Sequence, residues 1–238
     1  EGYLEVFRTA EAFDAECRQA EQDATEYDVT YRVLDSAALA EEEPDLAAGL
    51  AGAIHWTQPW TATDPGALVA AYANHFQQQG GHVIQAPLET LSRNGSGWRA
   101  TVGGETIATE QVVLALGPWS APWLDQQGLH VPLFVKRGYH MHYATQPTAK
   151  LNYWLMDAEI GYLLAPMNAG VRLTTGAELD RLESPADEEQ LGAAEKVART
   201  IFPLGERKDS AAWKGARPCL PDMKPVIGPA PRHPGLWL

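Results

Sequence analysis

Cysteine is scarce in this sequence, and basic residues are few. Its two cysteines, Cys17 and Cys219, lie far apart and lack the CxxC or Cys/His spacing of a disulfide scaffold or a zinc site. A reducing compartment therefore fits best. Lys and Arg total 18 against 31 Asp and Glu, which gives a net charge of -13. A polyanion would be repelled at long range by this charge, so nucleic acid is not expected as a partner.

Long apolar runs are also absent. No stretch of 18 apolar residues occurs, and residues 1–4 have neither an initiator Met nor the basic and apolar regions of a signal peptide. We therefore expect no transmembrane segment and a cytoplasmic location, with peripheral attachment to the inner face of the membrane as the alternative. Because residues 234–238 stop inside an apolar run, we also expect a piece of a longer protein.

Capping residues indicate where two helices begin. Thr9 can cap a helix whose apolar residues recur at helical spacing from Phe13 onward. Asp64 and Pro65 predict another, because Asp accepts free amide protons and Pro at the first position has none to lose. Its apolar face is expected at Leu68, Tyr72 and Phe76, ending at Gly80-Gly81.

Two further helices are predicted less directly. The acidic segment 34–43, which ends at Pro44, is expected to be a surface helix. Ser184-Pro185 is expected to open a helix, with Asp187 completing a start that resembles a capping box.

Strand-like patterns occupy most of the remaining chain. Short segments from His82 to Ala108, separated by glycine turns, predict an antiparallel meander that includes 82–85. The apolar run 112–116 predicts a strand buried on both faces of a parallel sheet. From Val131 onward, alternating segments predict a second, mostly antiparallel sheet. The expected fold class is therefore α+β.

Generic catalytic motifs are missing. The chain contains no GxSxG, HExxH, Walker or GxGxxG sequence. Three segments instead occur in a characteristic order: 112–120 (VVLALGPWS), 137–140 (RGYH) and 213–218 (WKGARP), followed by Pro221-Asp222 and 225–228 (PVIG). Together with Thr174 to Glu178 (TTGAE), this ordered set resembles the D-amino-acid oxidase superfamily, and most of all bacterial D-amino-acid dehydrogenases and glycine-oxidase-like enzymes.

The resemblance implies two domains and an FAD cofactor. It implies a substrate-binding domain, a mostly antiparallel sheet with flanking helices, over residues 1–63 and 129–212, packed on a partial α/β FAD-binding domain over 64–128 and 213–238. The family's glycine-loop unit, which holds the ADP part of FAD at a helix N-terminus, has no counterpart in this sequence, nor does its C-terminal flavin-binding segment. We therefore expect weak or no FAD binding, and no catalysis, by these residues alone.

The resemblance also implies site residues. Arg217 is expected to bind a substrate carboxylate through paired hydrogen bonds, and Tyr162 to assist it. Tyr139 and His140 are expected near the substrate; His140 and His142 share one strand face, but packed or solvated histidines are a simpler interpretation than a metal site. Backbone close to the flavin is expected at Ala115, Gly117, Trp119, Gly138, Gly215 and Gly228.

For the complete enzyme, the resemblance implies hydride transfer from the Cα of a D-amino acid to flavin N5, giving a 2-oxo acid and ammonia. The flavin performs the difficult step, so no catalytic acid or base is assigned to this chain. A dehydrogenase would also need an electron acceptor, such as a component of the respiratory chain. Two alternatives stay open: flavin-dependent oxidation of another carboxylate substrate, namely sarcosine, hydroxyproline or a 2-hydroxy acid, and a non-catalytic folded fragment or binding module.

Overall fold

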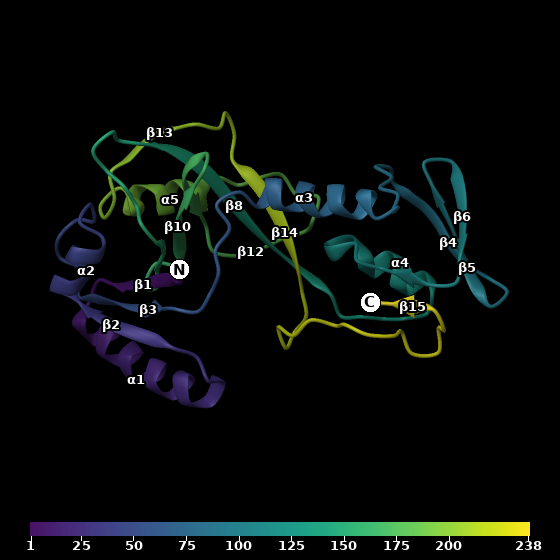
Figure 1. Ribbon diagram of the computed structural model, residues 1–238, viewed down its shortest axis with the longest axis horizontal. Helices are drawn as coiled ribbons and strands as arrows, with labels where there is room; N and C mark the ends of the chain where they lie inside the picture. Colours follow the sequence, from purple (N-terminus) through teal and green to yellow (C-terminus); the bar gives the residue numbers. More distant parts are fainter. The chain divides into compact units, whose positions relative to one another are not determined.

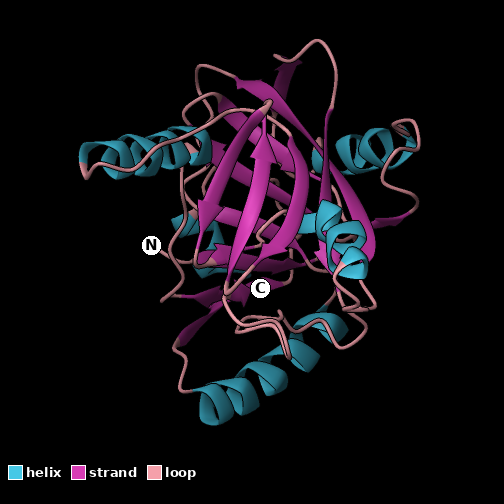
Figure 2. Ribbon diagram, turned by 90° about the vertical axis from the view of Figure 1, so that its right-hand side faces the viewer, coloured by secondary structure: helices cyan, strands magenta, loops and turns pink.

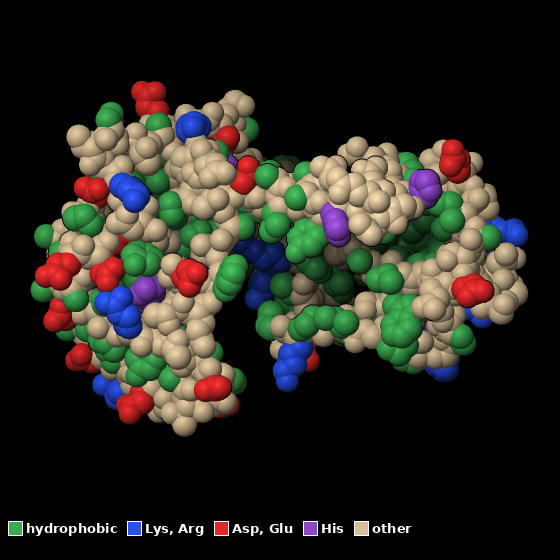
Figure 3. All heavy atoms as spheres, in the orientation of Figure 1, with side chains coloured by type: hydrophobic (Ala, Val, Ile, Leu, Met, Phe, Trp, Pro, Cys, Tyr) green, Lys and Arg blue, Asp and Glu red, His purple; other side chains and the backbone are tan.

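The structure, a computed structural model, describes residues 1–238 and consists of two units (Figure 1). Unit 1 comprises Glu1–Val69, Gly138–Glu178 and Pro185–Gly215, and unit 2 comprises Ala70–Arg137, Leu179–Ser184 and Ala216–Leu238. The helices and mixed sheets confirm the expected α+β class. Acidic side chains, red in Figure 3, are scattered over the visible face, in keeping with the negative net charge.

Unit 1 contains most of a 10-stranded sheet, whose strands are among those drawn in magenta in Figure 2. Its main path runs β12-β8-β11-β10-β9-β1-β3-β2, and β13 and β14 pair with β8 off this path. Strand β8 pairs antiparallel with β11 and β13, and β10 pairs antiparallel with β9 and β11, as expected. Strand β3 is antiparallel to β1 and β2, whereas β1 runs parallel to β9. The strands are β1 (Tyr3–Phe7), β2 (Tyr31–Asp35), β3 (Gly52–Trp56), β8 (Phe134–Thr145), β9 (Trp154–Asp157), β10 (Tyr162–Met167), β11 (Gly170–Thr174), β12 (Glu178–Leu179), β13 (Leu204–Arg207) and β14 (Trp213–Cys219). The first residues of β8 and the last residues of β12 and β14 are assigned to unit 2.

Side-chain alternation gives this sheet two different faces. On β8, Tyr139, Met141 and Tyr143 are buried, whereas His140 and His142 point to the other side and are half-buried. The buried face packs against α5 (Glu189–Ala198) and α2 (Ser36–Glu42). The opposite face is covered near β1 and β3 by α1 (Ala10–Tyr27), whose Ala20 packs with Phe7, Ile54 and Trp56.

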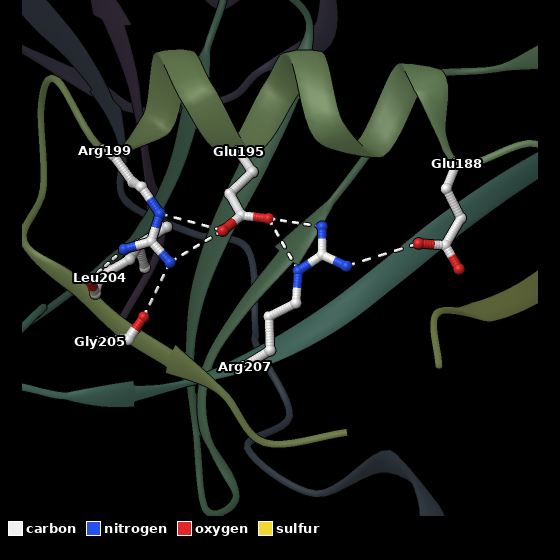
Figure 4. A network of polar contacts seen from close by, with 6 residues as sticks. All are labelled: Glu188, Glu195, Arg199, Leu204, Gly205 and Arg207. Atoms are coloured by element: carbon white, nitrogen blue, oxygen red, sulfur yellow. Dashed lines mark hydrogen bonds and ion pairs between the residues drawn. The ribbon is translucent and has the colours of Figure 1, made fainter. Parts of the chain in front are cut away.

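A carboxylate between two arginines ties α5 to β13 (Figure 4). One oxygen of Glu195 accepts from Arg199 at 3.0 and 2.8 Å, and the other accepts from Arg207 at 2.9 and 2.6 Å. Arg199 also donates to the carbonyls of Leu204 and Gly205. Burial alone would raise the pKa of Glu195, but the hydrogen bonds from Arg207 and Arg199 lower it. The network fixes the chain that follows α5 against the sheet.

Unit 2 contains most of α3 (Pro65–Gln78), a three-stranded antiparallel sheet and a small parallel pair. The antiparallel sheet is the predicted meander, formed by β4 (Leu88–Asn94), β5 (Gly97–Val102) and β6 (Glu105–Thr109). The parallel pair is β7 (Val112–Val113) with β15 (Leu236–Trp237). A 3₁₀ turn, η1 (Gly117–Trp119), leads into α4 (Ser120–Gln126).

Two predicted helix starts are confirmed by their capping bonds. The Thr9 hydroxyl accepts from the backbone N–H of Ala12 at 3.3 Å, and the Asp64 carboxylate accepts from that of Ala67 at 2.9 Å. Helix α3 also ends where expected, since Gly80 adopts a φ of +89°. A residue with a Cβ would be strained in that conformation.

Several predicted elements are wrong. Residues 82–85 are not a strand, since no neighbouring strand pairs with them. The start of α5 lies at Glu189 rather than after Pro185, because the Ser184 hydroxyl donates to Asp180 and only Asp187 reaches the amide of Glu189.

The bounds of two further predicted elements, a strand and a helix, also need correction. The run 112–116 forms a strand only at β7, which pairs with β15, and Val113 is 68% exposed, so the run is not buried on both faces. The predicted surface helix 34–43 starts only at Ser36, because Tyr31–Asp35 forms β2 and pairs with β3.

Candidate functional site

A polar cluster occupies the half-buried face of the unit 1 sheet. It consists of His140 and His142 on β8, Arg172 on β11, Asp209 after β13 and Trp213 at the start of β14. The antiparallel register places His142 directly opposite Arg172 and His140 opposite Thr174. Cross-strand partners share a face of the sheet, so three distant stretches of sequence bring these side chains together.

Hydrogen bonds orient the imidazole of His142. Its Nδ1 lies 2.9 Å from Asp209 Oδ2, and its Nε2 accepts from Nε of Arg172 at 3.0 Å. An arginine can only donate, so Nε2 carries the lone pair and the proton of the neutral ring is on Nδ1, directed at Asp209. The backbone N–H of His142 donates to the same Asp209 oxygen. Asp209 therefore fixes both the position and the tautomer of this histidine.

His140 is held neutral beside this pair. Its ring stacks on Trp213, with centroids 4.6 Å apart, and meets His142 edge-on at 5.3 Å. Burial, with the positive charge of Arg172 and the proximity of His142, lowers the pKa of His140 to about 4. At neutral pH the cluster therefore contains a neutral His140. No group of three or more His, Cys, Asp or Glu side chains is placed to hold a metal ion.

Gly215, predicted near the cofactor, has a clear packing role in unit 1. A Cβ at this position would lie 2.1 Å from the Trp213 ring, so the indole packs where a side chain would otherwise stand. Gly138, on β8, is buried. The absence of a side chain at Gly215 thus permits the Trp213 position that shields His140.

The two predicted substrate tyrosines lie on the buried face of the sheet, opposite His140. Tyr139 is 1% exposed, and its hydroxyl donates to Glu178 at 2.6 Å while accepting from the backbone N–H of Asp187. Tyr162 is equally buried, with its hydroxyl 3.5 Å from Arg8, which forms an ion pair with Asp157. Each hydroxyl is therefore engaged with protein groups, and the assignment of both tyrosines to the substrate stays a prediction.

Unit 2 contains an apolar cavity of about 430 Å³. Ala115 and Gly117, both predicted near the cofactor, line it together with residues 218–220 and 223–226. Gly117 has a φ of +58°, and the space at its missing Cβ is open apart from Pro218 at 3.9 Å. The backbone can therefore approach a ligand closely at this point.

Three other predicted residues belong to unit 2. Arg217 is exposed on β14, next to Pro218 of the cavity wall. Trp119 is exposed on η1, outside the cavity lining. Gly228 has a φ of +148° and exchanges backbone hydrogen bonds with Leu238. The structure thus brings Ala115 and Gly117 together at one cavity, while the assignment of all these residues to substrate or cofactor stays a prediction.

The cavity fits part of an FAD molecule. Its volume lies within the range of small-molecule sites, and its mainly apolar lining suits a planar aromatic ring system such as the flavin. Lys224 is its one charged lining residue, and the chain has no glycine-rich phosphate loop. The residues present therefore fit the ring portion of the cofactor and do not form a cradle for its diphosphate.

A family model described as FAD dependent oxidoreductase (DAO) matches residues 1–238. The chain belongs to this DAO family. This confirms the resemblance carried by the three ordered motifs, and FAD is the cofactor of the DAO family, as expected. The structure has no helix that is both long and apolar enough to cross a membrane.

Solved structures share the DAO fold of this chain. Glycine oxidase from Geobacillus kaustophilus superposes with a TM-score of 0.85 at 23% identity, covering 100% of this chain and 64% of that one. L-proline dehydrogenase from P. horikoshii gives a TM-score of 0.84 at 17% identity, covering 99% and 65%. Iminodiacetate oxidase from Chelativorans sp. BNC1 gives a TM-score of 0.77 at 19% identity, covering 99% of this chain and 65% of that one. The chain thus spans about two thirds of the length of these DAO-fold proteins.

The polar cluster includes residues that the motifs did not single out. Arg172 and Asp209 were not among the predicted site residues, although Arg172 stands between Val171 and Leu173 in an otherwise apolar strand. A lone arginine at an alternating position of such a strand is a signal that could have found it. Asp209 gives no such signal, because only the pairing of β13 with β8 brings it to His142.

Proposed function

We propose that the protein, with FAD bound, oxidatively deaminates D-amino acids to 2-oxo acids and ammonia. The observation that carries this proposal is the match of the DAO family model over the whole chain. The preference for D-amino acids rests on the resemblance of the 112–120, 137–140 and 213–218 segments to bacterial D-amino-acid dehydrogenases. When bound, FAD supplies the hydride acceptor for this chemistry.

In this proposal the chain's own residues bind and orient. Arg217 holds the substrate carboxylate, since a guanidinium can donate two parallel hydrogen bonds to it and so fix which Cα hydrogen is presented. The backbone of Ala115 and Gly117, with the apolar walls around it, packs against the flavin ring and excludes water. No side chain is assigned as a general acid or base. A respiratory-chain component is the proposed electron acceptor if the enzyme is a dehydrogenase.

The test compares D-alanine with L-alanine in anaerobic mixing with the FAD-bound protein, followed by loss of flavin absorbance and release of ammonia. Bleaching by the D-isomer alone is expected. Glycine, sarcosine, L-proline, hydroxyproline and a 2-hydroxy acid complete the series, because each presents a carboxylate. Oxidation confined to one of these would replace the D-amino acid as substrate, and a protein that never retains flavin would favour a binding module.

Arg217→Ala tests the carboxylate assignment. Loss of a charge-assisted bond of about 2–4 kcal/mol corresponds to a fall in kcat/KM of roughly 30- to 1,000-fold. Arg99→Ala is the matched control, since Arg99 is an exposed unit 2 arginine whose side chain bonds only to Asn94. Equal activity of Arg217→Ala and Arg99→Ala would overturn the role of Arg217.

A further inference from the structure

The hydrogen-bonding pattern of Arg172 leaves its two terminal nitrogens available to bind a ligand. Its Nε donates to His142, whereas the two terminal nitrogens, Nη1 and Nη2, bond to no protein group. The side chain is half-buried, yet these nitrogens are not sealed from solvent. Burial lowers the pKa of Arg172, and the nearby charges of Asp209 and Asp64 act in the opposite direction. The guanidinium stays charged because its ordinary pKa is far above neutrality.

The hydrogen bond to His142 orients the planar group of Arg172. Asp209 fixes the tautomer of His142, and His142 then accepts from Nε of Arg172. The ring of His142 is in turn packed edge-on against His140, which stacks on Trp213. An arginine fixed in this way loses little side-chain entropy on binding a ligand, which favours binding over a mobile surface arginine.

We propose that Arg172 is the centre of a binding site for a monocarboxylate, with His142 and Asp209 as positioning residues. The terminal nitrogens of one guanidinium match the spacing of the two oxygens of a carboxylate. A phosphate would call for more positive charge than this cluster has. His140 is neutral, and His142 is hydrogen-bonded to Asp209, which is negative. The net charge of -13 also disfavours a multiply charged anion.

Asp64 is the protein carboxylate that competes with a ligand for Arg172. It contributes a favourable charge to Arg172, but its Oδ1 caps α3 through the N–H of Ala67 and makes no hydrogen bond to the arginine. An incoming carboxylate therefore has to displace only solvent from Nη1 and Nη2. This site is independent of the proposed oxidation, and its test needs no flavin.

The test is a titration of the ¹⁵N-labelled chain with sodium propionate, followed through the Arg Nε–H and His ring signals, with sodium phosphate in a parallel series. Propionate should shift the signals of Arg172 and His142 with saturation. Arg172→Gln should weaken binding at least about tenfold, the loss expected for one charge-assisted pair. Arg18→Gln, a change of the same charge at an exposed position on α1, should weaken it less than about twofold, because distant surface charges are screened.

Asp209→Asn separates positioning from a purely structural role. It should weaken propionate binding about threefold to tenfold and convert the His142 ring ¹⁵N pattern from one tautomer to a mixture. Equal losses in Arg172→Gln and Arg18→Gln, saturation by phosphate but not propionate, or no saturation at all would overturn the site. Unchanged tautomer and affinity in Asp209→Asn would overturn the positioning role. Should Arg172→Gln fail to fold, Arg172→Lys, which keeps the charge but loses the fork, decides by the same criterion.

Discussion

The two units differ in how completely their apolar side chains are buried. Unit 1 buries an extensive apolar core on one face of its sheet and a second, smaller one beneath α1. Unit 2 has a core centred on Trp98, Leu114 and Leu236, yet large apolar side chains lie exposed on α3, β7 and the 223–227 segment. Exposed apolar surface of this extent is typical of ligand or protein contact rather than of a free surface. Unit 1 thus packs more of its apolar side chains into its own cores than unit 2 does.

The largest expected effect is on the small core of unit 2. Trp98 is fully buried, and its Nε1 donates to the carbonyl of Pro234 at 3.0 Å. Trp98→Ala removes this bond and leaves a cavity, which should cost about 3–5 kcal/mol. Hydrogen exchange should then show loss of protection in β4 to β6 while the unit 1 sheet stays protected. Loss of protection in both units together would show that they fold as one cooperative body.

Substitution of a buried carboxylate tests how much the internal contacts of unit 1 contribute to stability. Glu43 is 0% exposed and accepts from the backbone N–H groups of Asn152 and Tyr153. Glu43→Gln places an NH₂ group among these donors, which should destabilise the chain by about 1–3 kcal/mol in chemical denaturation. Glu41→Gln, on the exposed side of the same segment, should change the stability by no more than about 0.5 kcal/mol.

The same substitution has a defined pH dependence. Burial raises the pKa of Glu43 to about 7 from its ordinary value of 4.5, and the hydrogen bonds from Asn152 and Tyr153 only partly oppose this. The stabilisation from the protonated carboxyl is present below 4.5 and is lost as the pH rises through 7. Glu43→Gln should therefore cost less at pH 8 than at pH 5. A cost that grows with pH would show that the amide donors outweigh burial.

Substitution of Glu195, the carboxylate between two arginines in unit 1, should have a smaller effect. Glu195→Gln loses the charge that both Arg199 and Arg207 contact, and in this partly solvated setting it should cost about 1 kcal/mol in thermal or chemical denaturation. Because the pKa of Glu195 is lowered, its contribution is present above the ordinary value and is lost as the pH falls through the lowered one. The difference between variant and wild type should shrink in acid. Glu188→Gln, which removes the negative charge from one 3.4 Å contact to Arg207, should have almost no effect.

These contrasts also explain how much could be predicted from the sequence. Local signals were reliable where one side chain satisfies a nearby backbone group, as at the Thr9 and Asp64 caps, or where a turn needs glycine, as at Gly80. Period-two alternation predicted the strands of the unit 1 sheet from Val131 onward, but β1, β2 and β3 of the same sheet were not predicted. It could not predict that β7 has a single neighbour, because burial of a strand depends on pairing with distant segments.

The candidate sites show the same limit. Ordered motifs led to Ala115 and Gly117, which do line one cavity, because a glycine beside an apolar run has a local conformational reason. The link from Asp209 through His142 to Arg172 joins β8, β11 and the end of β13. Only the register of β8 with β11 and β13 makes these residues neighbours, and no spacing within any single segment encodes it.

The smallest expected effect lies on the exposed face of α3. Tyr72 is 70% exposed, and no residue of α3 is buried, although Leu68, Tyr72 and Phe76 share the face that the sequence pattern assigned to packing. Tyr72→Ser exchanges residues of similar helix propensity, so the free energy of unfolding should change by no more than about 0.5 kcal/mol. The matched measurement in unit 1 is Leu155→Ala, a fully buried position where about 2–5 kcal/mol is expected. A loss above about 2 kcal/mol for Tyr72→Ser would mean that this face is packed in solution, and the contrast between the two units would then disappear at α3.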